Sequence, residues 1–150
     1  MQQIFIHCDL PKIDMPNVIL LKKWAKAVLT HEKSSAELAI KIVDSIEITD
    51  LNTRYRHKNK PTNVLSFPFD IPPDLQDQLL FLGDVVICAE VVNKEALEQN
   101  ITKKAHWAHM VIHGTFHLLG YDHENEADAA IMEDKEIHIL TLLGFPNPYQ

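Results

Sequence analysis

The sequence contains little cysteine, little glycine and no long apolar run. Two of its 150 residues are cysteines, Cys8 and Cys88, and they do not form a Cys-X-X-Cys pair. This usage predicts free, buried thiols in a reducing cytoplasm rather than disulfides. No apolar stretch approaches the ~20 residues that a helix needs to span a bilayer. The N-terminus also lacks a basic segment followed by an apolar one, so we expect no signal peptide, no membrane partner and a cytoplasmic protein.

The composition is that of an ordinary globular protein, with 46% hydrophobic and 23% charged residues. A chain of 150 residues can bury a core, which predicts a single hydrolase domain spanning residues 1–150. The formal net charge of -7 argues against a generic nucleic-acid binder. The charges are unevenly spread, however. A basic cluster lies within seven residues and consists of Arg54, Arg56, His57, Lys58 and Lys60. Acidic residues gather in the last third, at Glu124, Glu126, Asp128, Glu133, Asp134 and Glu136.

Apolar periodicity predicts short strands early in the chain and clustered helices later. Strands are expected at residues 3–8, 37–43, 64–69 and 81–89, and helices at 17–30, 44–55, 90–99, 102–119 and 124–143. Candidate N-caps are Asn17, Asp44 or Ser45, and Thr102. Pro68 indicates an edge strand or a strand end, and Pro72 and Pro73 place a loop at 70–78. We therefore expect an α+β fold with one small mixed β-sheet of about four strands packed with helices.

The helix expected at 102–119 carries a row of histidines. Residues four apart lie on one helix face, so His113 and His117 can hold one ion, although the spacing also offers His109 with His113. Gly120 favours the first pair, because it permits a left-handed turn after which His123 can return as a third ligand. We therefore predict a metal site of His113, His117 and His123. Three imidazoles leave one position of a tetrahedral zinc ion open, as in a catalytic site.

The neighbouring polar residues are given other roles. His106 and His109 are expected to pack in the core or to hydrogen-bond a ligand from behind. For Asp122, the sequence leaves open whether it supports His123 or serves only as a turn residue.

The spacing of the three predicted ligands is also that of the metzincin proteases, whose motif is HExxHxxGxxH. In those enzymes the glutamate takes a proton from the water on zinc. Gly114 stands at this position and cannot do so. Its missing side chain is expected to open space beside the metal, where a substrate group can approach. The substitution argues against peptide hydrolysis by the usual route.

Three blocks, residues 51–69, 82–88 and 113–123, resemble the YbeY family of bacterial metal-dependent endoribonucleases. The resemblance implies an α+β fold around a small mixed sheet, one zinc ion held by His113, His117 and His123, and single-strand-specific cleavage of RNA. It also implies a role in ribosomal RNA maturation near the 3′ end of the small-subunit RNA, and in ribosome quality control. Arg56 matches the family's functionally important arginine, whereas His57 stands where a relative carries glycine.

The chemistry of Arg56 is compatible with that role. A planar guanidinium can hold two phosphate oxygens and stabilise charge that develops on phosphorus. On composition alone Arg56, Lys58 and Lys60 would be solvated surface charges. Asn63 and Ser66 are candidates for lining the same cleft.

The leading hypothesis is phosphodiester cleavage in RNA, with Arg56 and His113 as catalytic residues and no evident general base. The expected partners are ribosomal RNA and the small ribosomal subunit or its proteins; the oligomeric state is left open. One alternative is a metallopeptidase. Another is a non-catalytic zinc-containing ribosome-assembly factor, in which Asp122 or His109 closes the metal site as a fourth ligand.

Overall fold

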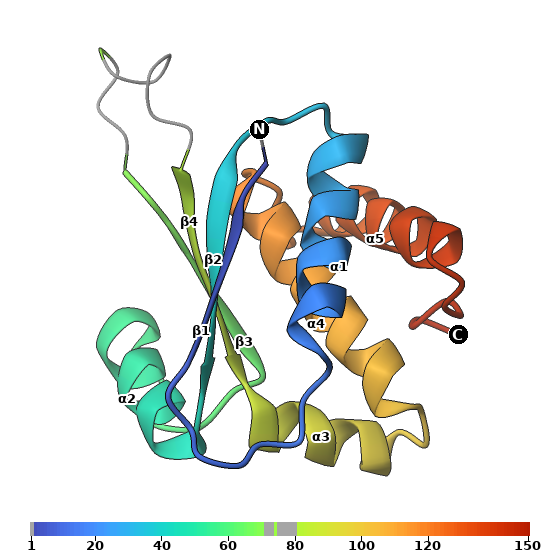
Figure 1. Cartoon of the computed structure of the whole chain (residues 1–150). Coiled ribbons are helices and arrows are strands. Elements are labelled where there is room, and N and C mark those ends of the chain that lie inside the picture. The colour runs from blue at the N-terminus through green and yellow to red at the C-terminus, as the bar shows by residue number, and fades with distance from the viewer. Residues whose placement is uncertain (1, 71–73, 75–80) are drawn as a thin grey trace.

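The computed structural model describes residues 2–70, 74 and 81–150, and these form a mixed sheet packed with helices (Figure 1). In order, the elements are β1 (Ile4–Cys8), α1 (Val18–His31), β2 (Glu37–Val43), α2 (Ser45–Arg56), β3 (Val64–Pro68), β4 (Phe81–Cys88), α3 (Ala89–Glu98), α4 (Lys103–Leu118) and α5 (Glu126–Leu142). The predicted α+β class and the type of each predicted element are confirmed. The predicted loop at 70–78 lies outside the described residues, apart from Asp70 and Asp74.

The sheet has the strand order β1-β2-β4-β3. Strands β1, β2 and β4 run parallel to one another, and β3 pairs with β4 in the antiparallel sense. Strand β3 therefore lies at an edge of the sheet, in agreement with the prediction from Pro68. A proline is tolerated in an edge strand because its missing N–H does not interrupt a central ladder of hydrogen bonds. Strand β4 is internal, and Val85–Cys88 at its end are buried.

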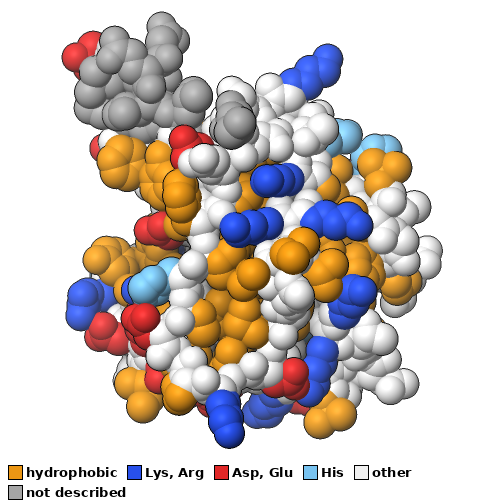
Figure 2. Space-filling view, viewed as in Figure 1, with side chains coloured by type: hydrophobic (Ala, Val, Ile, Leu, Met, Phe, Trp, Pro, Cys, Tyr) orange, Lys and Arg blue, Asp and Glu red, His pale blue; other side chains and the backbone are white. Residues whose placement is uncertain are grey.

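Helices cover the two faces of the sheet unequally. Helices α1, α4 and α5 lie on one face, whereas α2 lies on the other (Figure 1). The larger core cluster fills the first side and draws buried residues from β1, α1, β2, β4, α3, α4 and α5, including Leu38, Ile87, Trp107 and Ile139. On the side seen in Figure 2, apolar side chains occupy the space between the sheet and α1.

Helix α4 is the central helix of this layer. It contacts α1, α3, α5, β3 and β4. Ten of its sixteen residues are buried, so few of its side chains can reach solvent. A histidine of α4 can therefore contact solvent or a ligand only where the neighbouring elements leave its side chain uncovered.

The helix termini follow the capping residues read from the sequence. Asn17 accepts a hydrogen bond from the Ile19 amide at 2.7 Å, Asp44 from Glu47 at 2.9 Å, and Thr102 from Ala105 at 3.1 Å. Each of these side chains satisfies an amide that lacks a partner within its helix.

Two further expectations concern thiols and membranes. Cys88 is buried and free, whereas Cys8 is free but only half-buried. Among the described residues, no helix combines the length and the apolar character that a membrane crossing requires.

Candidate metal centre

His113 and His117 face each other near the end of α4. Their Nε2 atoms lie 3.1 Å apart. Two zinc–nitrogen bonds of about 2.0–2.1 Å at a tetrahedral angle place their nitrogens about 3.3 Å apart. The pair is thus spaced to hold one ion between its rings.

His123 reaches the same point from outside the helix. Gly120 has φ +102°, the positive value that the sequence predicted for a chain leaving α4. The ring centroid of His123 then lies 5.4 Å from that of His113 and 4.9 Å from that of His117. One potential ligand atom from each of the three histidines lies within 4.8 Å of the others. The structure therefore brings the three predicted ligands together.

The turn that carries His123 is anchored by Tyr121. The Tyr121 hydroxyl donates to the carboxylate of Glu32, which also accepts from Lys135 at 3.2 Å. The Tyr121 ring packs edge-on against Phe116, with centroids 5.5 Å apart. These contacts join the end of α1, the turn and α5, so the position of His123 depends on three separate segments.

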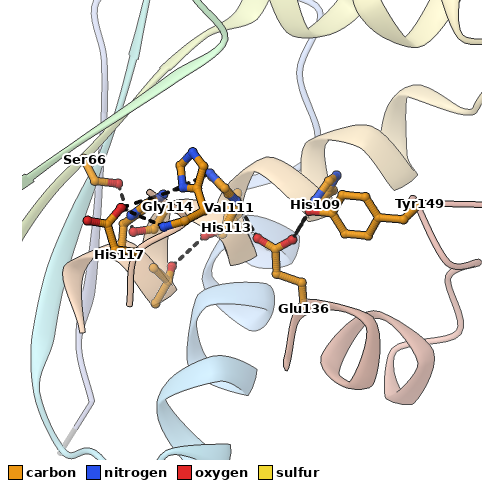
Figure 3. Close-up of polar contacts among 11 residues, drawn as sticks. Ser66, His109, Val111, His113, Gly114, His117, Glu136 and Tyr149 are labelled. Carbon is orange, nitrogen blue, oxygen red and sulfur yellow. Dashed lines mark hydrogen bonds and ion pairs between the residues drawn. The ribbon is translucent and has the colours of Figure 1, made fainter. Parts of the chain in front are cut away.

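Glu136 on α5 supports the pair from behind, and the sequence did not identify it. Its side chain is fully buried, and its Oε2 lies 2.5 Å from Nδ1 of His113 (Figure 3). A carboxylate that holds the far nitrogen of a ligating histidine fixes the orientation of the ring. One sequence signal existed, because Glu136 shares a helical stripe with the buried Met132, Ile139 and Leu140. A carboxylate on such a stripe requires a partner.

The acid–base properties of these groups suit a ligand set. Burial lowers the pKa of His117 to about 4, and the neighbouring His113 and His123 contribute to the decrease. His117 therefore stays neutral, with a lone pair available, well below pH 7. Burial by itself raises the pKa of Glu136, but hydrogen bonds with His109 and His113 outweigh it and hold that pKa at about 2.

Gly114 has a different role from the one predicted. The expectation that it opens space beside the metal is wrong, because the residue is buried and faces the sheet. A Cβ at this position would lie 2.5 Å from Cγ1 of Val85 and 3.3 Å from Oγ of Ser66. Ser66 also donates a hydrogen bond to the Gly114 carbonyl at 3.0 Å (Figure 3). Glycine is required here so that α4 can approach the strands closely.

Arg56 lines the same cleft as the three histidines, a hollow of about 790 Å³. Its guanidinium donates to the carbonyls of Ser66 at 3.0 Å and Tyr55 at 3.2 Å. It also lies 5.3 Å from the centre of the Phe67 ring. The exposed arginine is therefore held against the edge strand rather than extended freely into solvent.

Two lysines of the basic cluster form the rim of this cleft. Lys58 and Lys60 line it, and the buried Asn52 donates to the Lys60 carbonyl at 2.9 Å. His57 ends α2 in the left-handed conformation, with φ 61°. This geometry explains why glycine suits the position, and shows that His57 keeps the turn despite the steric cost of its Cβ.

The remaining candidate residues from the sequence differ in which residues they contact. Asn63 and Ser66 line the cleft as predicted, although Asn63 donates to Glu95. His106 is buried against Glu95 at 2.9 Å, and His109 lies 3.1 Å from Glu136.

In the part of the chain that the structure describes, neither His109 nor Asp122 joins the group formed by His113, His117 and His123. Asp122 accepts from the His123 amide at 2.7 Å, as a turn residue does, and the same oxygen lies 4.0 Å from Nδ1 of His123.

Comparison with known proteins identifies the family. The family model described as "Endoribonuclease YbeY" matches residues 10–144. The chain belongs to the YbeY family. The proteins named "Endoribonuclease YbeY" from Nitrosococcus oceani and Alteromonas mediterranea are similar to it. The first is 45% identical over 147 residues, 98% of this chain and 96% of that protein. The second is 50% identical over 149 residues, 99% of this chain and 93% of that protein.

A solved structure supports the fold as well. The solution structure of a Thermotoga maritima protein covers 95% of this chain and 91% of its own, with a TM-score of 0.59 at 23% identity. The YbeY match includes Arg56, the three histidines and Glu136, whereas Tyr149 lies beyond the matched residues. The family assignment confirms the resemblance seen in the three sequence blocks.

Proposed function

We propose that this protein is a zinc-dependent endoribonuclease that cleaves single-stranded RNA during maturation of the small-subunit ribosomal RNA, near its 3′ end, and in ribosome quality control. Its YbeY relatives are named as endoribonucleases. The observation that carries the proposal is the shared cleft, in which Arg56 and the basic rim lie with His113, His117 and His123. Residues 1–150 act as one hydrolase domain, and a core shared by β1 and the later helices supports a single domain. We place this domain in the cytoplasm.

The three histidines fit the proposed ion. Three neutral imidazoles are a known donor set of catalytic zinc, and they leave one coordination position open. When bound, zinc would supply Lewis-acid stabilisation of a phosphate oxygen and would lower the pKa of a water molecule. His113 serves as ligand and catalytic residue, because the ring held by Glu136 presents its Nε2 towards the cleft.

Arg56 binds and orients the phosphate. A guanidinium has five N–H groups, and two nitrogens already donate to the carbonyls of Tyr55 and Ser66. Those two bonds hold the planar group in place, while its remaining N–H groups can donate to phosphate oxygens. The positive charge then offsets the negative charge that builds up as the phosphorus–oxygen bond to the leaving ribose breaks.

The charge distribution suggests how the substrate is selected. Lys58 and Lys60 on the rim attract the RNA backbone, but the chain as a whole carries a net charge of -7. Affinity for free RNA should therefore be weak and should fall steeply with salt. The small ribosomal subunit or its proteins supply the remaining specificity.

The proposal is tested with purified wild type, His113→Ala and His7→Ala, the last an exposed histidine on β1. Zinc content is measured by elemental analysis, and cleavage is measured on unstructured RNA, duplex RNA and unstructured peptides. Wild type and His7→Ala should hold one zinc ion per chain and cleave only unstructured RNA. His113→Ala should lose both properties. Full cleavage by metal-free His113→Ala would overturn the mechanism.

The same experiment separates the alternatives. Peptide cleavage without RNA cleavage would identify a metallopeptidase. Zinc bound to a wild type that cleaves neither polymer would favour the assembly factor with a structural ion.

A further inference from the structure

The C-terminal tail contacts the residues behind the metal centre. Tyr149 lies seven residues after the end of α5, and its hydroxyl donates to Oε1 of Glu136 (Figure 3). Nε2 of His109 lies 3.1 Å from the same oxygen and 3.2 Å from the Tyr149 hydroxyl. The other oxygen of Glu136 lies 2.5 Å from Nδ1 of His113. One buried carboxylate thus joins the tail, α4 and a predicted ligand.

The tail is itself held in place. Phe145 packs edge-on against the buried Trp24, with ring centroids 5.8 Å apart. Asn147 then accepts a hydrogen bond from the Tyr149 amide at 2.8 Å. Burial and the adjacent Glu136 carboxylate both raise the pKa of Tyr149, so its hydroxyl keeps the proton that it donates. The ring of Tyr149 also packs edge-on against His109, with centroids 5.4 Å apart.

The carboxylate determines which nitrogen of His113 can bind a metal. Glu136 is acceptor-only, so the proton of a neutral His113 ring belongs on Nδ1, and Nε2 carries the lone pair. Glu136 can do this only if its own position is fixed. Tyr149 and His109 both contact Oε1, which leaves Oε2 directed at His113.

We propose that Tyr149 and His109 are positioning residues of the metal centre. They hold Glu136 so that it keeps His113 in the Nδ1–H form, and the C-terminal tail thereby strengthens metal binding. This inference rests on the metal site of the proposed function, but it does not depend on the substrate being RNA.

A second ion among His109, His113 and Glu136 is the main competing arrangement. Potential ligand atoms of these residues also lie within 4.8 Å of one another. The 2.5 Å between Glu136 and His113 suits a hydrogen bond. Two ligand atoms on one zinc ion stand about 3.3 Å apart, so the observed separation is too short for an ion between them. Two zinc ions per wild-type chain would overturn the proposal.

The test compares Glu136→Gln and Tyr149→Phe with two matched controls. Glu98→Gln removes an exposed carboxylate on α3, and Tyr55→Phe removes the hydroxyl of an exposed tyrosine on α2. The zinc dissociation constant is measured by competition with a chromophoric chelator. Nitrogen-15 NMR of the His113 ring gives its tautomer in the zinc-free and zinc-loaded protein. Urea unfolding establishes that each variant is folded.

Glu136→Gln should weaken zinc binding about 10–100-fold, and Tyr149→Phe about tenfold, while both controls keep the wild-type constant. Zinc-free wild type should show His113 in the Nδ1–H form, and both test variants should show a mixture of tautomers. A purely structural role would lower the unfolding midpoint but would leave the tautomer and the zinc constant unchanged.

Each contrary result identifies what fails. Tyr149→Phe with control values for zinc and tautomer would remove the tail from the metal centre and overturn the proposal. A wild type that binds no zinc would overturn the metal site itself, and with it this role of the tail. Loss of RNA cleavage is not a readout here, so failure of the nuclease assignment alone would leave these measurements unaffected.

Discussion

Oε2 of Glu136 lies 2.5 Å from Nδ1 of His113, which joins a carboxylate on α5 to a predicted metal ligand on α4. The turn that carries His123 is tied in the same way to α1 and α5 through Glu32, Tyr121 and Lys135. The site is therefore assembled from segments far apart in the sequence. Single substitutions in these segments should therefore change metal binding, phosphate binding or stability without changing all three.

Arg56→Ala should lower kcat for RNA cleavage by about 10²–10³-fold, because one preorganised donor to the developing charge is lost. Arg56→Lys should recover little, since an ammonium lacks the planar fork that the Ser66 and Tyr55 carbonyls orient. Zinc content should stay at the wild-type value in both variants. Arg54→Lys is the control, because Arg54 pairs with Asp50 on the exposed side of α2. Wild-type turnover by Arg56→Ala would exclude this residue from the mechanism.

Zinc should stabilise the folded protein by linkage. At free zinc 1,000-fold above its dissociation constant, removal of the ion should lower the free energy of unfolding by about 4 kcal/mol. His123→Ala should abolish this dependence on zinc. Because the His123 side chain is 56% exposed, the same substitution should change the zinc-free protein by only about 0.5 kcal/mol. Urea titrations with zinc and with chelator measure both quantities, and identical zinc stabilisation of His123→Ala would argue that it is not a ligand.

Gly114→Ala should destabilise the protein by about 1–3 kcal/mol, despite the higher helix propensity of alanine. The added Cβ would lie 2.5 Å from Cγ1 of Val85. Val85→Ala removes that methyl group, so the double variant should lose less stability than the sum of the two single variants. Urea unfolding of the four proteins gives the coupling energy. Strict additivity would mean that the close approach of α4 to β4 does not set the requirement for glycine.

Glu32→Gln should reveal a pH-dependent contribution to stability. Burial raises the pKa of Glu32, but hydrogen bonds with Tyr121, Lys135 and His31 outweigh it and hold that pKa below 4.5. The folded state therefore binds this proton less readily than the unfolded chain. The resulting stability is present above pH 4.5 and is lost as pH falls through the lower folded-state value.

At pH 7, Glu32→Gln should cost about 1–2 kcal/mol, and the difference from wild type should shrink below about pH 4.5. Thermal unfolding of the two proteins from pH 7 to pH 3 measures this. A difference that stays constant across the range would attribute the effect to packing rather than to ionisation.

The sequence was sufficient wherever structure depends on near neighbours. Helical spacing placed His113 and His117 on one face, and Gly120 gave the turn that returns His123. Asn17, Asp44 and Thr102 marked helix starts because a capping side chain acts within a few residues. Pro68 marked the edge strand for an equally local reason, its missing amide hydrogen.

The other features of the site depend on packing between segments that are far apart in the sequence. Glu136 looked like one more carboxylate in an acidic stretch, and only the docking of α5 against α4 buries it behind His113. Gly114 seemed to open the site, but the approach of Val85 shows that it serves helix–sheet contact. The sequence by itself determined the predicted ligands and their arrangement, because helical spacing and the turn at Gly120 are local features of the chain. Tertiary structure alone decided which side chains support those ligands, because burial and hydrogen bonding there join residues more than twenty positions apart.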